Sequence, residues 1–181
     1  TNPPAQPEDI EKSGCIIAVG DAFEIAPVIA GRELNAKYAQ RKNVLAVVSK
    51  KPNRTSRFAT VHLAGEERKI LAGILRVVAD QSNGKLPGWT EVVKKNYPLP
   101  VDLAVVETAK AFVQTPSAVL ILETQDPIAA RLAAAVVTAA GADKRLYYVG
   151  TYGNVRGICE VFEGNDSVLK MIDDIENGVL K

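Results

Sequence analysis

The 181-residue chain is long enough for one substantial domain, or for two small lobes that share a core. Hydrophobic residues make up 47% of it and charged residues 24%, as in ordinary globular proteins. The formal net charge of +1 gives no reason to expect a nucleic acid or a membrane surface as a partner. No apolar run approaches the ~20 residues that a membrane-spanning helix needs, so we expect no direct membrane insertion.

The cysteines and the histidine favour no metal site. Cys15 and Cys159 match no CxxC or zinc pattern, which favours reduced thiols in a reducing, cytoplasmic compartment. We expect Cys15 in the core. His62 is the single histidine and cannot form a histidine-based metal site alone. We expect His62 to be a packed or surface residue rather than a catalytic base, and no metal ion to be bound.

The first half of the chain predicts one βαβ unit over residues 13–82, after a leader at 1–12 that is disordered over 1–7 and forms a short helical turn at 10–12. Short, continuous apolar runs are typical of buried strands. Helical spacing after the first run places Val28, Ile29, Leu34 and Tyr38 near one face, with Pro27 in the first turn. The expected elements are strands at 15–19, 44–48 and 60–63 and helices at 22–40 and 66–80.

The second half predicts another βαβ unit over residues 101–181, after an irregular connection at 83–100 that is rich in proline and glycine. Leu103, Val106, Ala109 and Val113 are candidates for burial in its first helix. The unit looks truncated, because the last residues resemble the start of a strand. Its expected elements are helices at 101–114, 127–140 and 167–177 and strands at 118–122 and 146–149. Strands alternating with helices predict an α/β fold, a Rossmann-like parallel sheet flanked by helices.

Ligands of such sheets bind beyond the carboxyl ends of the strands. Four loops are expected there, at 20–21, 49–55, 123–127 and 150–157. Gly20 would let backbone approach a ligand closely, and Asp21 could accept hydrogen bonds from a ribose or a guanine. The alternative is that Asp21 only caps the following helix.

Two further loops carry candidate ligand-binding residues. Residues 49–55 include Lys50, Lys51 and Arg54, a basic group that could hold a phosphate or could be a solvated loop contacting another domain. The 150–157 loop contains Asn154 and Arg156 and is either a ligand contact or an ordinary turn. No GxGxxG or P-loop motif, no Ser/His/Asp set and no convincing carboxylate dyad is present. The candidate cofactor-binding residues are Gly20, Asp21, Ser49, Asn53, Arg54, Thr55, Asn154, Arg156 and Gly157.

The order of these segments resembles the molybdopterin oxidoreductase superfamily, which includes formate dehydrogenases and the large iron–sulfur subunit of NADH:quinone oxidoreductase. That family has a Glu-Asp-Ile opening, a glycine loop after the first strand, an Asp-Pro-Arg-x-Thr loop after the second and an Ala-Asn-x-x-Gly segment downstream. The segments that resemble it here are Glu8-Asp9-Ile10, Gly20-Asp21-Ala22-Phe23, Ala26-Pro27-Val28, Ser49 to Thr55, Phe58 to Leu63, Tyr152 to Gly157 and Ile175 to Lys181.

The resemblance implies that these loops correspond to a cradle for molybdopterin guanine dinucleotide. This chain departs from the family, because Asp21-Ala22 replaces the Ser/Thr-Asn pair and basic residues precede Pro52. The departures favour a structural domain of a redox-complex large subunit, similar to the large iron–sulfur subunit of NADH dehydrogenase, without bound cofactor and packed against other domains and subunits. We expect the chain alone to be inactive and its parent to be an oxidoreductase. The alternatives are half of the cofactor cradle of a formate dehydrogenase-like molybdenum or tungsten enzyme, or a stand-alone nucleotide-binding or scaffold module.

Overall fold

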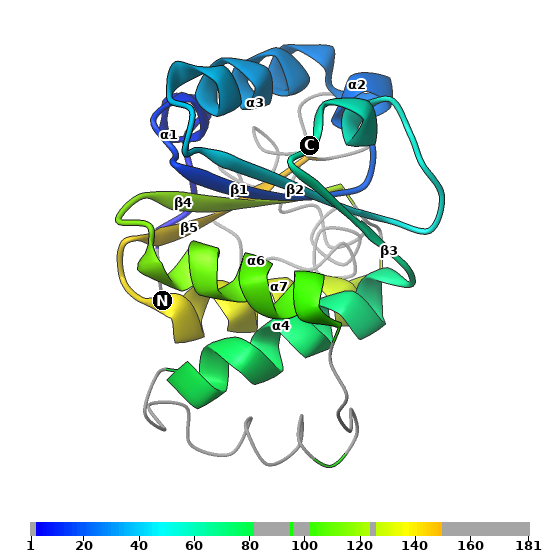
Figure 1. Cartoon of the computed structure of the whole chain (residues 1–181), viewed down its shortest axis with the longest axis vertical. Helices are drawn as coiled ribbons and strands as arrows, with labels where there is room; N and C mark the ends of the chain where they lie inside the picture. The colour runs from blue at the N-terminus through cyan, green and yellow to red at the C-terminus, as the bar shows by residue number, and fades with distance from the viewer. Residues whose placement is uncertain (1–2, 82–94, 96–101, 124–125, 150–181) are drawn as a thin grey trace, which may run out of the picture. The chain divides into compact units, whose positions relative to one another are not determined.

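A computed structural model describes residues 3–81, 95, 102–123 and 126–149. Its centre is a five-stranded sheet in which all neighbouring strands are parallel, in the order β3-β2-β1-β4-β5 (Figure 1). The strands are β1 (Cys15–Val19), β2 (Val44–Ser49), β3 (Val61–Ala64), β4 (Ala118–Leu122) and β5 (Lys144–Tyr148). The expected α/β fold with a parallel sheet is therefore confirmed.

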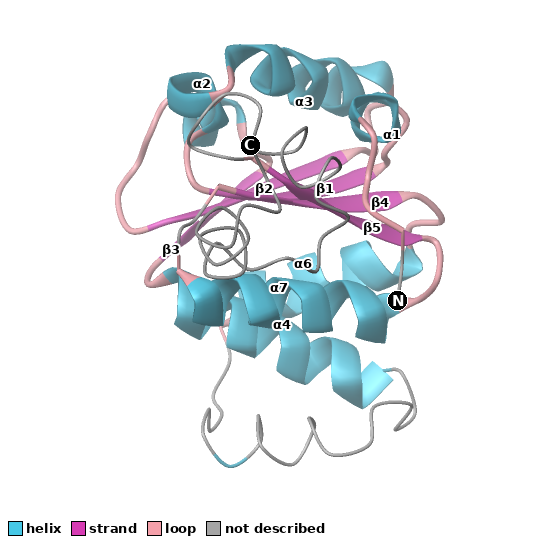
Figure 2. Cartoon of the chain, turned by 180° about the vertical axis from the view of Figure 1, so that it is seen from behind, coloured by secondary structure: helices cyan, strands magenta, loops and turns pink. Residues whose placement is uncertain are grey.

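Helices cover both faces of the sheet. Figure 2 shows α1 (Pro7–Glu11), α2 (Ala22–Ile25) and α3 (Pro27–Ala39) on one face. The other face carries α4 (Glu67–Gln81), α6 (Leu103–Gln114) and α7 (Pro127–Ala140). A short 3-10 helix, η1 (Thr55–Phe58), joins β2 to β3. None of the described helices is both long and apolar enough to cross a bilayer.

Strand alternation divides the core into two clusters. Ile17, Val19, Leu120 and Leu122 pack toward α4, α6 and α7. Ile16, Ala18, Val119 and Ile121 pack toward α1 and α3. Because β1 and β4 are buried on both faces, they consist of continuous apolar runs rather than of alternating polar and apolar residues.

The helix expected at residues 22–40 is two helices. The backbone breaks at Ala26 (φ −142°, ψ 74°), directly before Pro27, which begins α3. A proline disfavours the helical conformation in the residue before it, which explains the break. The buried face of α3 also differs from the expected one. Val28 and Tyr38, which were expected near the same face as Ile29, are 74% and 66% exposed. Ile29, Ala30, Glu33 and Ala36 are the buried residues of α3.

Two other details differ from the sequence-based expectation. Part of the leader that we expected to be disordered is packed, because Ala5 is buried and its N–H donates to the carbonyl oxygen of Leu146 at 2.9 Å. Leu103, expected in the core, is 68% exposed as the first residue of α6 after its cap Asp102. The division into two βαβ units stays a prediction, and within the described residues β1–β5 belong to one sheet.

Candidate functional site

The carboxyl ends of β1, β2 and β4 lie side by side. Val19 is in register with Val48 on one side and with Leu122 on the other, so Gly20, Ser49 and Glu123 follow at one edge of the sheet. The connection from β1 leads to β2, whereas β4 lies on the other side of β1. Strand order thus reverses between β1 and β4, the place where ligands bind in open α/β sheets.

Asp21 bridges the loops after β1 and β2. Its carboxylate accepts hydrogen bonds from the backbone N–H of Arg54 (3.1 Å), the backbone N–H of Thr55 (3.3 Å) and the Thr55 hydroxyl (2.7 Å). Partial burial works to raise the pKa of Asp21, but these hydrogen bonds outweigh it, and the pKa lies below its usual value. Although Asp21 is the residue before α2, its side chain makes no capping hydrogen bond to that helix.

The rest of the 49–55 loop is also held by internal hydrogen bonds. The Asn53 amide donates to the carbonyl oxygen of Gly20 at 2.8 Å, and Asn53 exchanges hydrogen bonds with Ser56. Thr55 is fully buried, while Arg54 is exposed. The structure therefore brings Gly20, Asp21, Ser49, Asn53, Arg54 and Thr55 together at one edge. Asn154, Arg156 and Gly157 lie outside the described residues.

Ser49 and His62 form a close pair that sequence reasoning missed. The Ser49 Oγ lies 2.9 Å from Nε2 of His62 and donates its own hydrogen to the carbonyl oxygen of Lys51. Because that hydroxyl proton is used, His62 must carry its proton on Nε2 and donate it to Ser49. His62 is therefore a structural donor in this arrangement rather than a base that activates Ser49.

Two buried carboxyl groups lie at the point where the strand order reverses. Glu33 of α3 is fully buried, and neither its carboxyl oxygens nor those of Glu123 have a hydrogen-bond partner. Burial, followed by the charges of Glu123 and Asp21, raises the pKa of Glu33 to about 8. Burial, then Asp21, raises the pKa of Glu123 to about 8, even though the Asp21 backbone N–H partly offsets the rise. Both carboxyls hold a proton at neutral pH.

The sequence held a partial signal for these acids. Glu123 directly follows a strand, at a loop that we expected to lie at the site, but no partner for it was apparent. Glu33 was hidden because it occupies a core position of a helix where an apolar residue is the usual choice. The carboxylate pair that the sequence did not indicate is thus formed by the fold.

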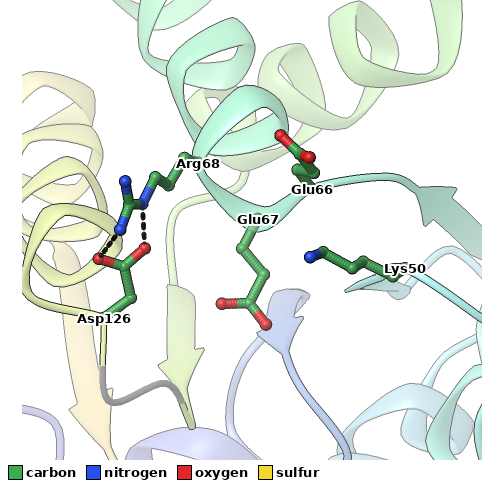
Figure 3. A pocket seen from close by; sticks show the side chains of 5 residues that line it. All are labelled: Lys50, Glu66, Glu67, Arg68 and Asp126. Carbon is green, nitrogen blue, oxygen red and sulfur yellow. Dashed lines mark hydrogen bonds and ion pairs between the residues drawn. The ribbon is translucent and has the colours of Figure 1, made fainter.

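A pocket of about 360 Å³ lies at the same edge, toward α4 and α7. Its lining residues are all charged: Lys50, Glu66, Glu67, Arg68 and Asp126 (Figure 3). Arg68 binds Asp126 with two hydrogen bonds, one of them 2.9 Å long, and Glu66 pairs with Lys69 at 3.1 Å. The side chains of Lys50 and Glu67 extend into this pocket (Figure 3).

Cys15 is buried in β1, as expected. Burial raises the pKa of its thiol to about 12, so it is a protonated core residue rather than a nucleophile. Among the residues that the structure describes, no group of three or more histidine, cysteine, aspartate or glutamate side chains could hold a metal ion. No protein-family model and no curated protein sequence matches the chain.

The position of Arg54 leads to a first prediction. Arg54→Ala is expected to change the free energy of unfolding by less than about 0.5 kcal/mol, because the side chain is exposed and the backbone N–H that binds Asp21 remains. Thermal unfolding of the two proteins measures this. A loss of several degrees in Tm would show that the guanidinium has a stabilising partner.

Proposed function

We propose that this chain forms part of the molybdopterin-oxidoreductase-like domain of a redox-complex large subunit, where it has a structural role and binds no cofactor itself. The proposal combines the family resemblance of its loops with the position of those loops at one edge of a parallel sheet. The parent would be an oxidoreductase similar to NADH:quinone oxidoreductase. Other domains and subunits of that complex would be the partners of this domain.

One observation carries the absence of a cofactor in this proposal. In phosphate-binding loops, backbone N–H groups face the anion. Here the N–H groups of Arg54 and Thr55 donate instead to the carboxylate of Asp21. A carboxylate of the protein thus occupies the place that a phosphate oxygen would take, and its negative charge repels a second anion.

The neighbouring side chains support the same conclusion. Binding sites for bases and pterins are lined mainly by apolar and aromatic groups, with few polar ones. The pocket beside α4 has five charged lining residues instead. Glu33 and Glu123 add two more carboxyl groups whose pKa values respond to the charge of Asp21.

Nucleotide titration tests the proposal. We expect guanosine diphosphate, at about 1 mM, to leave the Tm of the chain unchanged and to give no heat in calorimetry. We also expect no pterin fluorescence from oxidised extracts of the purified protein. Saturable binding of guanosine diphosphate, or a stoichiometric pterin, would overturn the proposal and favour the cradle of a formate dehydrogenase-like enzyme.

Asp21→Asn is the matched variant for this test. Asparagine keeps the size of the side chain and one acceptor oxygen but removes the negative charge. If repulsion by Asp21 is what excludes phosphate, the variant gains weak guanosine diphosphate binding that the natural sequence lacks. Equal binding of guanosine diphosphate by both proteins would show that the charge of Asp21 does not control phosphate binding.

A further inference from the structure

The space above Gly20, between the sheet and α3, contains the two buried acids. Alternation along β4 places Glu123 on the same face as Val119 and Ile121, which is the face that α3 covers. Gly20 contributes no side chain there, and a Cβ at Gly20 would lie 2.7 Å from Oε2 of Glu123. Glu33 enters from the buried face of α3. The missing side chain of Gly20 thus makes room for the Glu123 carboxyl on the side where Glu33 lies.

Within the described part of the chain, the charged groups with the largest effects on these two carboxyls are all acids. The charges of Asp21 and Glu123 raise the pKa of Glu33. The charges of Asp21, Glu24 and Glu67 raise the pKa of Glu123. These acids come from the end of β1, from α2, α4 and the end of β4. None of these charges is positive. A protein that gathers acids around two buried carboxyls without a counter-charge loses stability, and such groups are found where a ligand binds.

Neither carboxyl oxygen of Glu33 has a hydrogen-bond donor, and the backbone N–H of Asp21 lies near the Glu123 carboxyl without reaching hydrogen-bonding geometry. Buried polar atoms are almost always paired, so the two unpaired oxygens of the fully buried Glu33 are exceptional. Glu33 is fully buried, whereas Glu123 as a residue is partly exposed at the sheet edge. The carboxyl oxygens of Glu123 are buried, so the pair lies beneath the edge where α/β sheets bind their ligands.

We propose that Glu33 and Glu123 form a binding site for a small cation at the carboxyl edge of β1 and β4. The ligand is a hard, oxygen-seeking metal ion or a protonated amine, whose charge replaces the protons of the two carboxyls. A metal held by two carboxylates completes its shell with water and backbone oxygens, as Mg²⁺ often does. This site is independent of the structural role proposed above and would exist in any parent protein.

Proton release is the signature that distinguishes this site from exposed acids. Both carboxyls are protonated at neutral pH, so a cation must displace up to two protons on binding. Calorimetry at about pH 7, in two buffers of different ionisation enthalpy, measures that number for Mg²⁺, Mn²⁺, Ca²⁺ and putrescine. We expect one of these probes to raise Tm by about 3 °C or more near 10 mM, with at least one proton released per cation bound.

Substitutions locate the site. Glu33→Gln and Glu123→Gln should each abolish the Tm shift and the proton release, whereas Glu107→Gln, at an exposed acid of α6 on the other face of the sheet, should retain both. Binding of Mg²⁺, Mn²⁺ or Ca²⁺ would identify the ligand as a metal ion, and binding of putrescine would identify it as a protonated amine. The proposal is overturned if no probe binds, if binding releases no proton, or if it persists in the Glu33→Gln/Glu123→Gln double variant. None of these outcomes depends on whether guanosine diphosphate binds.

Discussion

Gly20→Ala is expected to lower the free energy of unfolding by about 3 kcal/mol, one of the largest effects of a single methyl group in this chain. Two costs add. Gly20 has φ +116°, where any side chain strains the backbone. The added Cβ would also lie 2.7 Å from Oε2 and 2.9 Å from Cβ of Glu123, closer than real Cβ contacts. Urea denaturation of the variant and the natural chain measures the difference.

Gly31→Ala is the matched control. Gly31 lies inside α3, and a Cβ there would meet nothing within 4 Å. Alanine is the better helix former by roughly 0.5–1 kcal/mol, so this variant should be slightly more stable than the natural sequence. If both substitutions had the same effect, the local conformation and packing at Gly20 would not be the cause.

A double variant separates the two costs at Gly20. Glu123→Ala keeps the Cβ of residue 123 but removes the carboxyl that the new methyl group would meet at 2.7 Å. Adding it to Gly20→Ala should recover part of the loss, while the strain from the positive φ remains. Additive effects of the two substitutions would show that the contact with the carboxyl contributes little.

The layered fold could be predicted because β1, β2 and β4 are short, continuous apolar runs, which are typical of buried parallel strands. Residues 15–19 and 118–122 were expected as strands, and both are strands over those bounds, buried on both faces. The carboxyl-edge location of the candidate loops followed from parallel topology alone. Gly20 and Asn53, which are 33 residues apart in the sequence, accordingly meet at 2.8 Å.

The details of the site depended on information that periodicity does not contain. Spacing placed Val28 and Tyr38 near the same helix face as Ile29, yet both are exposed. Glu33 is among the residues of the buried face of α3. The backbone N–H groups of Arg54 and Thr55 donate to Asp21 because the loop after β2 approaches the loop after β1. A sequence shows that Asp21 can accept hydrogen bonds, but only the three-dimensional arrangement shows that the donors are internal.

Glu33→Gln is expected to remove about half of a pronounced pH dependence of stability, because Glu123 contributes a similar share. The pKa of Glu33 is 4.5 in the unfolded chain and about 8 in the fold, so the folded state holds a proton that the unfolded state releases across this range. Stability from this group is complete below about pH 4.5, falls as the pH rises toward 8 and is constant above it. The shift corresponds to at most about 5 kcal/mol, shared with the neighbouring Glu123.

Glutamine cannot ionise, and it leaves a buried polar group much like the protonated acid. The variant should therefore match the natural chain near pH 4.5 and exceed its free energy of unfolding by a few kcal/mol near pH 8.5. Urea denaturation at both pH values measures this, with Glu107→Gln as the exposed control that keeps the natural profile. Parallel pH profiles for Glu33→Gln and the natural chain would mean that Glu33 is ionised in the fold. An ionised Glu33 at this depth requires a bound counter-charge, so the same profiles, measured with and without Mg²⁺, would show whether a cation supplies it.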